Sequence, residues 1–591
     1  MKAQLIRFGM LLTALTLLVF GARILRAAEG GTRYEVEVRP DVKVPMRDGV
    51  LLSANVFLPK AEGRFPVLLQ RSPYGKGDRH NGEGIACARR GCVFVSQDCR
   101  GRGGSGGVWE PFANERADGR DTQAWILKQP WCNGRLGTVG GSYVGYTQWI
   151  ATPNADEDFK ATFSYVPLID CYGDAAYTGG AFNLSLLMGW GSIVSYPLDT
   201  KNPLAGWNAS RWRTAFWTLP LCQWDRALDH RVQYLRDWIA HPCFDQYWAA
   251  RGIRGRWQDV TVPNFVVGGW YDIFASSVFE HIGAVRAMSR SPVARAHQHL
   301  LVGPWTHGAG ESSKVGDLDF GPLATAKAAH LAQMSNRWFE HWLNGKENDV
   351  ESWPAYRIFV MGRNQWRDEA QWPPKRARYS SWYFHSQGRA NTLSGDGRLS
   401  TASPGGEPRD TFVYDPADPV PTLGGCNLMG CPAGPRDQTP AEKRSDVLVF
   451  TSAPLPKDVE ATGPVKVVLY AASSAVDTDW TAKLVDVDRQ GRPYNLCDGI
   501  LRARHRESPQ TTSFLQPART YRYEINVGVT SNVFLAGHRI RVEISSSNFP
   551  RFDRNLNTAD AWGTATTPVK ATQCIYHNRQ SPSSLVLPVI P

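Results

Sequence analysis

The sequence predicts an α/β core followed by an all-β region. Short apolar runs at residues 65–69, 93–97, 265–269 and 300–303 are typical of buried parallel strands, and segments of helix length lie between several of them. From about Trp382 apolar and polar residues alternate instead, which indicates half-buried strands of a sandwich. The 591 residues, 42% of them apolar, also exceed what one hydrophobic core usually holds. We therefore expect two or three domains.

The segment GGSYVG at residues 140–145 is the strongest local motif of the core. An apolar run precedes it, and a stretch without Pro or further Gly follows it as far as Ala151. Strand, sharp turn and helix in this order present the nucleophilic serine of α/β-hydrolases. The second glycine usually lies two residues after the serine, whereas here it is Gly145 and that position is Val144. The alternative is a turn of small residues where a helix packs close to a sheet.

Two later strands carry an acid and a histidine in the order that this fold requires. Asp272 follows the run at 265–269, and His307 follows the run at 300–303. A single Asp or His after a strand is more often a turn or capping residue. Because three residues come in the right order, we predict Ser142 as nucleophile, His307 as its base and Asp272 as the carboxylate that orients the base.

The developing oxyanion needs donors aimed at it. The backbone N–H of Tyr143, directly after the nucleophile, is the expected first donor. The second must come from the loop after an early strand, and the turn at residues 71–76 after the run at 65–69 offers Tyr74. From its own sequence context Tyr74 would be a packed or surface tyrosine, so its place in the site needs further support.

The chain resembles the serine hydrolases that group cocaine esterase, α-amino acid ester hydrolases, glutaryl acylases and X-prolyl dipeptidyl peptidases. The resemblance extends from about Val44 to near the C-terminus, and its motifs together are highly specific. They are RSPY at 71–74, QD at 97–98 with RG at 100–101, GSY at 141–143 with Gly145, GWYD at 269–272, GPW at 303–305 with His307, RWF at 337–339 with HWL at 341–343, NL at 495–496 with DGI at 498–500 and Arg502, and NFPR at 548–551 with Asn555.

The resemblance carries three expectations. The tyrosine that matches Tyr74 gives its phenol to the oxyanion hole in that family. The family also accepts a glycine three residues after the serine, which accounts for Val144. Its C-terminal β region is a jelly roll that packs against the catalytic domain and helps to frame the site. The predicted fold class is thus an α/β-hydrolase core with an inserted helical cap and a C-terminal β jelly-roll domain.

The motif positions predict the domain bounds. We expect a signal peptide or N-terminal anchor at 1–28, the first part of the core at 29–169, a helical cap at 170–256, the second part of the core at 257–375 and the jelly roll at 376–591. Tryptophans concentrate in or near the cap, where they line an apolar acyl or aromatic pocket or simply pack the cap helices together. They are Trp190, Trp207, Trp212, Trp217, Trp224, Trp238 and Trp248.

The N-terminus has the features of an export signal. Lys2 and Arg7 precede an apolar run at residues 8–22, which is too short for a comfortable membrane span of about 20 residues. We expect a periplasmic or secreted protein. No clear cleavage site stands near Ala22, Ala27 or Ala28, so an uncleaved anchor remains an alternative.

Charge and glycine content point to no nucleic-acid or dinucleotide partner. The formal net charge of +11 comes from scattered residues without a long basic run. The segment GRGGSGG at 101–107 matches a dinucleotide fingerprint, but VWEP at 108–111 follows where a helix should begin. We interpret it as a flexible loop near the rim of the site and expect no cofactor.

The eleven cysteines allow one local bridge and indicate no metal centre. Cys426 and Cys431 lie in a Gly/Pro-rich loop and are the most plausible disulfide. Cysteines 87, 92 and 99 lack a CxxC or HExxH partner pattern, which favours buried thiols or a disulfide. His297 and His299 share one face of a strand, but two histidines do not make a zinc site. We predict no metal.

The primary hypothesis is a serine hydrolase that forms an acyl-enzyme on Ser142 and acts on carboxylic esters, with amides as a further option. An X-prolyl dipeptidyl peptidase, an α-amino acid ester hydrolase or a related β-lactam acylase is the alternative. The peptidase and the amino acid ester hydrolase need acidic groups for a substrate ammonium, and Asp98, Asp170 and Asp174 are the candidates. A different class is a non-catalytic carbohydrate-binding protein with the hydrolase fold as scaffold, against which the complete triad argues.

The expected partner is a small-molecule ester or amide. We expect no nucleic acid and no stable membrane partner, unless the N-terminal segment stays uncleaved. The oligomeric state is left open.

Overall fold

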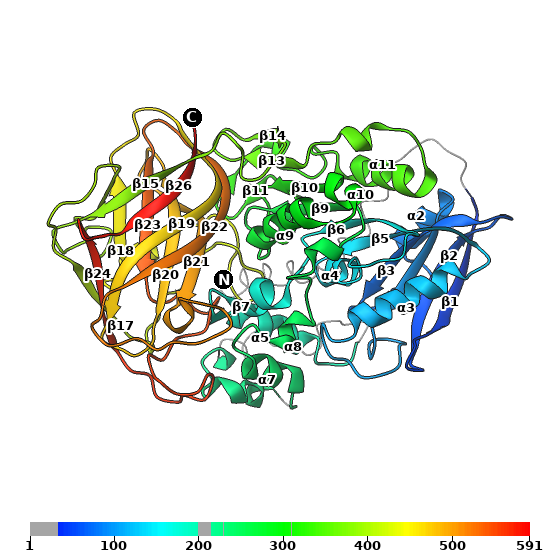
Figure 1. The fold of residues 1–591 in the computed structure, drawn as a ribbon, viewed down its shortest axis with the longest axis horizontal. Coiled ribbons are helices and arrows are strands. Elements are labelled where there is room, and N and C mark those ends of the chain that lie inside the picture. The colour runs from blue at the N-terminus through cyan, green and yellow to red at the C-terminus, as the bar shows by residue number, and fades with distance from the viewer. Residues whose placement is uncertain (1–33, 199–213, 229, 309) are drawn as a thin grey trace, which may run out of the picture.

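The computed structural model describes residues 34–198, 214–228, 230–308 and 310–591, which form two β-rich bodies side by side with a helical region beneath them (Figure 1). The predicted signal segment lies outside the described residues. Among the helices that are described, none combines the length and the apolar character needed to cross a membrane. The architecture confirms the predicted fold class: an α/β core, an inserted cap and a C-terminal β domain.

The core is a ten-stranded sheet whose middle strands run parallel. These middle strands are almost entirely buried because helices cover both faces, which explains their continuous apolar runs. In spatial order the strands are β1 (Val36–Pro45), β2 (Leu51–Pro59), β4 (Val93–Asp98), β3 (Phe65–Ser72), β5 (Cys132–Gly141), β6 (Phe159–Tyr165), β9 (Asn264–Gly269), β10 (Gln298–Gly303), β13 (Tyr356–Val360) and β14 (Gln365–Glu369).

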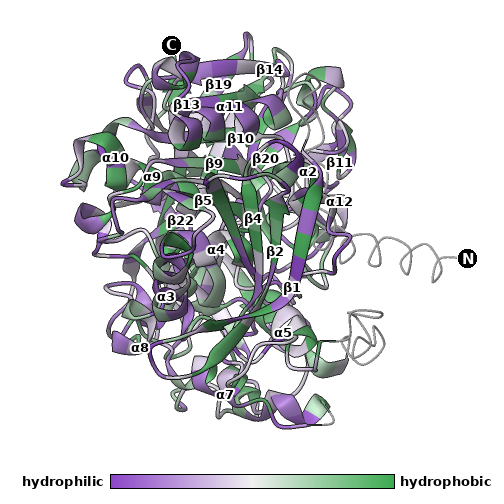
Figure 2. Cartoon of the chain, turned by 90° about the vertical axis from the view of Figure 1, so that its right-hand side faces the viewer, coloured by the Kyte–Doolittle hydropathy of each residue, from purple (hydrophilic) through white to green (hydrophobic). Residues whose placement is uncertain are grey.

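Helices cover the two faces of this sheet. On one face α2 (Gly82–Arg89) and α11 (Leu331–Asn344) pack on a cluster that includes Phe163 and Phe265. The opposite face carries α3 (Glu115–Leu127), α4 (Tyr143–Trp149), α9 (Ala275–Met288) and, beside α9, α10 (Pro292–Ala296). Figure 2 shows the central strands as a hydrophobic band between helices of mixed polarity. Helices such as α3 and α11 therefore bury one side and expose a polar one, whereas all residues of α4 are buried.

The cap is inserted between β6 and β9. The rings of Trp224, Trp238 and Trp248 are fully buried inside it. Within its described residues the elements are a π-helix (Cys171–Ala176), β7 (Tyr177–Thr178), β8 (Ala181–Phe182), α5 (Leu184–Ile193), a 3-10 helix (Leu221–Ala227), α7 (Gln233–Ala240), α8 (Gln246–Ala249) and a last 3-10 turn (Trp257–Asp259).

The β domain follows β14 and is connected in one twelve-stranded network. Its longest strand, β19, pairs with β22 over most of its length, with β26 in its first part and with β24 at its end. The strands are β15 (Arg378–His385), β16 (Arg398–Ser400), β17 (Asp410–Tyr414), β18 (Leu448–Ser452), β19 (Val459–Ser473), β20 (Asp479–Val487), β21 (Pro493–Arg502), β22 (Tyr521–Phe534), β23 (Arg539–Ser545), β24 (Ala571–Asn578), β25 (Ser581–Pro582) and β26 (Ser584–Ile590).

Smaller elements complete the part of the chain that the structure describes. They are the hairpin of β11 (Lys314–Val315) and β12 (Leu318–Asp319), the short helix α12 (Thr439–Glu442) and the 3-10 turns Pro322–Ala324, Asp349–Ser352 and Ala503–His505.

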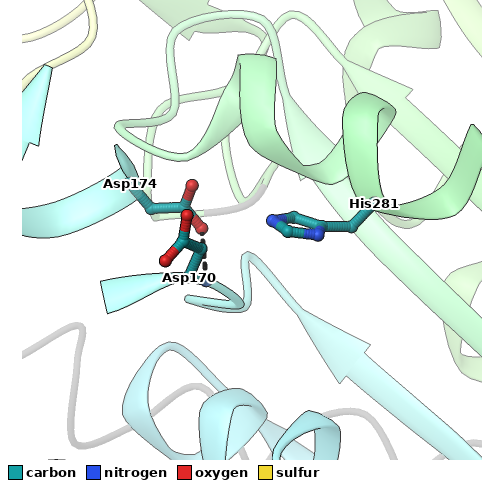
Figure 3. A group of neighbouring side chains, drawn as sticks. All are labelled: Asp170, Asp174 and His281. Carbon is teal, nitrogen blue, oxygen red and sulfur yellow. Dashed lines mark hydrogen bonds between the residues drawn. The ribbon is translucent and has the colours of Figure 1, made fainter. Parts of the chain in front are cut away.

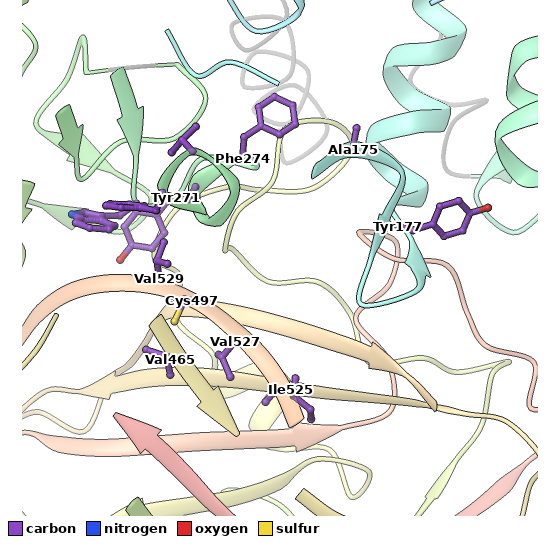
Figure 4. Close-up of a cluster of buried hydrophobic side chains, with 14 of the residues drawn as sticks. Ala175, Tyr177, Tyr271, Phe274, Val465, Cys497, Ile525, Val527 and Val529 are labelled. Atoms are coloured by element: carbon purple, nitrogen blue, oxygen red, sulfur yellow. The ribbon is translucent and has the colours of Figure 1, made fainter. Parts of the chain in front are cut away.

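The segment after β9 packs directly on the β domain. Tyr271 and Phe274, which flank Asp272, belong to the same buried apolar cluster as Cys497 of β21 and Val529 of β22 (Figure 4). Burial of aromatic side chains in such a cluster contributes strongly to association. The β domain therefore supports the loop that carries Asp272.

A buried arginine ties the β domain to the cap. Arg502, which is 1% exposed, pairs with Asp479 at 2.8 Å and with Asp553 at 2.9 Å. Asp553 in turn accepts the backbone N–H of Phe182 at 2.8 Å, and the Arg502 N–H donates to the Gly179 carbonyl at 2.8 Å. Cap and β domain therefore share one buried polar network.

The predicted Cys426–Cys431 bridge is wrong, because all eleven cysteines are free thiols in the structure. The Cys426 thiol donates to the Trp270 carbonyl, with 3.5 Å between sulfur and oxygen. Cys431 lies instead against the hydroxyls of Ser185 and Thr422. The two thiols therefore face different neighbours although their positions in the chain are close.

Candidate active site

Four strands of the core end at the same edge of the sheet. Tyr74 follows β3, Ser142 follows β5, Asp272 follows β9 and His307 follows β10. Since these strands run parallel, their carboxyl ends meet where α/β sheets build sites. The structure therefore brings the predicted residues to one region from segments up to more than two hundred residues apart.

Ser142 has a strained backbone at a tight turn, with φ 57° and ψ −122°. A Cβ at Gly140 would lie 2.2 Å from Cγ1 of Val144, and a Cβ at Gly145 would lie 2.7 Å from Cβ of Pro167. Val144 thus fills the space above Gly140, while α4 passes Pro167 at a point where only glycine fits. This explains why the second glycine comes one position late.

Asp272 and His307 are joined by a short hydrogen bond. The His307 Nδ1–H donates to Oδ2 of Asp272 at 2.5 Å, and the Phe274 N–H donates to Oδ1 at 2.9 Å. Both side chains are buried. Nε2 of His307 has no hydrogen-bond partner among the described residues, and the ring packs edge-on against Phe274 at 5.5 Å. An imidazole whose Nδ1 proton is held by a carboxylate keeps a lone pair on Nε2 for a neighbouring hydroxyl.

The loops after β9 and β10 are fastened to each other. The Trp270 N–H donates to the Gly303 carbonyl and the Tyr271 N–H to the Trp305 carbonyl, both at 2.9 Å. A Cβ at Gly269 would lie 2.3 Å from the Trp305 oxygen. This close approach holds Asp272 and His307 as one unit.

Tyr74 meets a tryptophan from the cap. The Trp190 Nε1–H of α5 donates to the Tyr74 phenol oxygen at 2.9 Å. An indole nitrogen only donates, so the phenol oxygen accepts and its own proton stays free. Burial raises the pKa of Tyr74, and hydrogen bonds with Trp190 and with the Ser142 hydroxyl oppose this only in part. The phenol is therefore a neutral donor next to Ser142.

Ser142, Tyr74 and Tyr143 share a small apolar pocket with about 400 Å³ of empty space, which includes open solvent. No Asp, Glu, Lys, Arg or His lines it among the residues that the structure describes. The remaining lining residues are Phe112, Leu168, Ala175, Leu186, Leu187, Trp190, Ile273, Phe274 and Leu428. Such a pocket fits an apolar group next to the nucleophile.

The cap tryptophans have different roles. Trp190 lines the pocket, whereas Trp224, Trp238 and Trp248 pack the interior of the cap. Trp217 is 43% exposed, and Trp207 and Trp212 lie outside the described residues. The sequence offered no signal that would single out Trp190, nor the contribution of Leu428 from the β-domain side.

The three candidate acids do not enter the Ser142 pocket. Asp98 pairs with Lys76 at 3.1 Å and accepts the Gly104 N–H, so the glycine-rich loop wraps it. Asp170 pairs with Arg254 at 2.6 Å. Asp174 lines a larger neighbouring cavity between core, cap and β domain, with about 1820 Å³ of empty space that includes open solvent.

Asp170, Asp174 and His281 form a buried group whose potential ligand atoms lie within 4.8 Å of one another (Figure 3). The Trp257 indole N–H donates to Nδ1 of His281 at 2.9 Å, so the neutral ring carries its proton on Nε2, which points toward the carboxyl groups. A metal ligand needs a lone pair there and a proton on the other nitrogen. The group therefore does not fit a metal ion.

The protonation of this group follows from its burial. Burial lowers the pKa of His281 to about 4. Burial, with a further contribution from the charge of Asp170, raises the pKa of Asp174 to about 8. At neutral pH Asp174 is thus mostly a neutral acid.

Comparison with protein families identifies both parts of the chain. The description "X-Pro dipeptidyl-peptidase (S15 family)" matches residues 48–309, and "X-Pro dipeptidyl-peptidase C-terminal non-catalytic domain" matches residues 348–586. The cocaine esterase of Rhodococcus sp. is 37% identical over 582 residues, which cover 94% of this chain and 98% of that protein. A putative serine esterase of Mycobacterium bovis is 27% identical, with 93% and 94% covered.

Solved structures share the whole architecture. An aminopeptidase from a marine sediment archaeon, Thaumarchaeota archaeon, superimposes with a TM-score of 0.81 at 25% identity and covers 96% of this chain and 99% of its own. An α-amino acid ester hydrolase superimposes with a TM-score of 0.80 at 24% identity over 95% and 98% of the two chains. At this identity the second likeness concerns the fold alone.

The turn at Ser142 generates a prediction for Gly145→Ala. The added methyl would collide with Pro167, so we expect a loss of about 1–3 kcal/mol in the free energy of unfolding. Because α4 would have to shift, we also expect fewer functional sites per mole in a titration with a serine-directed phosphonate. The control is Gly406→Ala, an exposed loop position with nothing within 4 Å of the new Cβ. Equal stability of both variants would contradict the packing argument.

The raised pKa of Asp174 generates a prediction for Asp174→Asn. The folded protein keeps a proton on Asp174 up to about pH 8, whereas the unfolded chain loses it near pH 4. In this window wild-type stability falls with rising pH by about 1.4 kcal/mol per unit from this group. The variant lacks this loss, so its stability relative to wild type should rise between pH 5 and 8 in urea unfolding. The exposed Glu62→Gln is the control, and parallel curves for Asp174→Asn would refute the assignment.

Proposed function

The chain belongs to the X-Pro dipeptidyl-peptidase family of serine hydrolases, and within this family we propose that it is an esterase for neutral, apolar acyl groups. Its relatives show that it is a serine hydrolase that acts on esters. The apolar pocket around Ser142, without an acidic residue in its described lining, is the observation that supports the finer assignment.

In this proposal Ser142 attacks the ester carbonyl. Nε2 of His307 takes the hydroxyl proton and passes it to the leaving alcohol, and Asp272 keeps the imidazole oriented and stabilises its charged form. The acyl group is then bonded to Oγ of Ser142. A water molecule that gives its proton to His307 attacks this second ester, so the products are a carboxylic acid and an alcohol.

Two donors are proposed for the oxyanion. Tyr143 is the first residue of α4, so its N–H has no intrahelical partner. The Tyr74 hydroxyl is the second donor, because Trp190 occupies its oxygen and leaves its proton free. Such donors act on the charge that develops in the transition state.

The pocket supports a neutral acyl group over an ammonium-bearing one. An ammonium buried beside Trp190, Phe274 and Leu187 without a carboxylate would lose several kcal/mol of hydration free energy. Asp174 lines the neighbouring cavity, and its raised pKa keeps it mostly uncharged at neutral pH. These features argue against an X-prolyl dipeptidyl peptidase and against an α-amino acid ester hydrolase.

We also propose that the protein is exported. The support is the N-terminal sequence, in which Lys2 and Arg7 precede an apolar run at 8–22. N-terminal sequencing of the protein from a periplasmic or culture fraction tests this, and an intact Met1 in the cytosolic fraction would refute it.

A matched pair of substrates tests the acyl preference. p-Nitrophenyl phenylacetate and the p-nitrophenyl ester of phenylglycine differ only by the α-amino group, which is protonated in mildly acidic buffer. We expect at least about 100-fold higher kcat/KM for the phenylacetate, since an unpaired buried charge costs several kcal/mol. We expect Ser142→Ala to lose on the order of 10⁴-fold or more of kcat, and Ala-Pro-p-nitroanilide to stay uncleaved. A preference for the phenylglycine ester or for the anilide would overturn the acyl assignment. An active Ser142→Ala variant would overturn the assignment of Ser142 as the nucleophile.

Trp190→Phe tests the orientation of the Tyr74 phenol. The variant keeps an aromatic ring in the pocket but removes the indole N–H that donates to Tyr74. We expect kcat to fall about 10-fold or more with a smaller change in KM, because the loss concerns the transition state. Trp238→Phe is the matched control: Trp238 stacks on Trp190 at 6.3 Å, and its own N–H has no partner among the described residues. Equal kinetics of the two variants would remove Trp190 from the proposed mechanism.

A further inference from the structure

Glu115 is a buried carboxylate behind the nucleophile that the proposed mechanism does not use. It is the first residue of α3 and is 1% exposed. Its Oε1 accepts the Tyr143 hydroxyl at 2.8 Å, and its Oε2 lies 3.0 Å from Nη2 of Arg71. A carboxylate is almost never fully buried unless it is paired, so this one connects two specific partners.

The two partners belong to the two chain segments that supply the donors of the proposed oxyanion hole, and we call each of these segments an arm. Tyr143 follows Ser142 and supplies the backbone N–H. Arg71 lies at the end of β3, three residues before Tyr74, whose phenol is the other donor. Glu115 therefore bridges the segment that carries one donor to the segment that carries the other.

Further contacts fix the arm of Arg71. Its Nε–H donates to Gln97 at 2.9 Å, and its Nη1–H donates to the Glu115 carbonyl at 3.0 Å. The Thr147 hydroxyl of α4 donates to the Arg71 carbonyl at 3.2 Å. A shift of the Arg71 guanidinium would therefore displace the backbone that leads from Arg71 to Tyr74.

The arm of Tyr143 is fixed as firmly. The Phe112 N–H donates to the Tyr143 phenol oxygen at 2.9 Å, and the two rings stack at 5.1 Å. Burial, followed by the charge of Glu115, raises the pKa of Tyr143 well above its usual value. The phenol therefore remains protonated near neutral pH, and its hydroxyl donates to Oε1 of Glu115.

The charges balance within this buried group. Arg71 has Asp118 as a second acid at 3.9 Å, and Asp118 is itself held by Arg100 at 2.6 Å. Two carboxylates, those of Glu115 and Asp118, thus face two guanidiniums, those of Arg71 and Arg100. Glu115 is therefore held in place by an oppositely charged partner on one side and by the Tyr143 hydroxyl on the other.

We propose that Glu115 is a positioning residue that holds the two oxyanion donors at a fixed separation. The inference rests on the proposed function. Donors aimed at the transition-state oxygen lose their effect when displaced, whereas ground-state binding in the apolar pocket does not depend on them. Loss of Glu115 should therefore lower transition-state stabilisation and leave binding of the acyl group intact.

The test uses Glu115→Gln, which removes the charge facing Arg71, and Tyr143→Phe, which removes only the hydroxyl bonded to Glu115. We expect each to lower kcat/KM for p-nitrophenyl phenylacetate about 10- to 100-fold per titrated active site, less than the roughly 10²–10³-fold loss caused by removing an oxyanion donor outright, because here the donors are displaced and not removed. Affinity for phenylethaneboronic acid, whose tetrahedral adduct needs the oxyanion hole, should fall in parallel, and inhibition by phenylacetate should not change. The double variant should add little to either single one.

The control is Glu442→Gln. Glu442 is a buried carboxylate that pairs with Arg541 at 2.6 Å in the β domain, far from Ser142 in the chain. It should lower thermal stability without changing boronate affinity. If Glu115→Gln and Tyr143→Phe also lower thermal stability without changing boronate affinity, Glu115 has only a structural role and the inference is wrong. If wild type neither cleaves the ester nor binds the boronate, the proposed function is wrong and the inference falls with it.

Discussion

The strained backbone at Ser142 is the constraint on which the site depends. A residue with φ 57° and a side chain persists only when its surroundings leave no alternative. Here Val144 fills the space above Gly140, and Gly145 lets α4 lie directly on Pro167. The turn thereby aims a hydroxyl out of the sheet and leaves the Tyr143 N–H unpaired. Strain, close packing and an available donor are therefore consequences of the same few contacts.

The rest of the site comes to this turn from neighbouring loops of the core, from the cap and from the segment before β18. The cap provides Trp190, which occupies the oxygen of Tyr74. The segment before the β domain's strands β18 and β19 provides Leu428 as a wall of the pocket. The loops after β9 and β10 are joined through Tyr271 and the Trp305 carbonyl, and this junction fixes the acid beside the imidazole. The pocket is therefore formed jointly by the core, the cap and the segment before β18, not by one domain alone.

Much of this could be predicted from the sequence, because strand-turn-helix signals are local. The α/β core, the C-terminal β region and the order of Ser142, Asp272 and His307 followed from apolar runs, alternation and the residues after the strands, whereas the jelly-roll assignment came from the family resemblance. Tyr74 needed a family resemblance, since a phenol near a strand end has no distinctive spacing. Trp190 was predicted only as one of seven cap tryptophans that line a pocket or pack the cap, and Glu115 was not predicted, because their roles depend on contacts between distant segments. The Cys426–Cys431 prediction was wrong for the same reason, since short separation in the chain says nothing of which way each thiol points.

The apolar cluster between the Tyr271–Phe274 segment and strands β21 and β22 limits how freely this architecture can be recombined (Figure 4). A β domain exchanged for that of a distant relative would present a different surface to the loop that carries Asp272. The loop that carries Asp272 would then lose part of the apolar contact that supports it. We therefore expect that a substitution on one side of this apolar cluster requires a compensating substitution on the other side, so the two domains constrain each other's sequence despite their separate sheets.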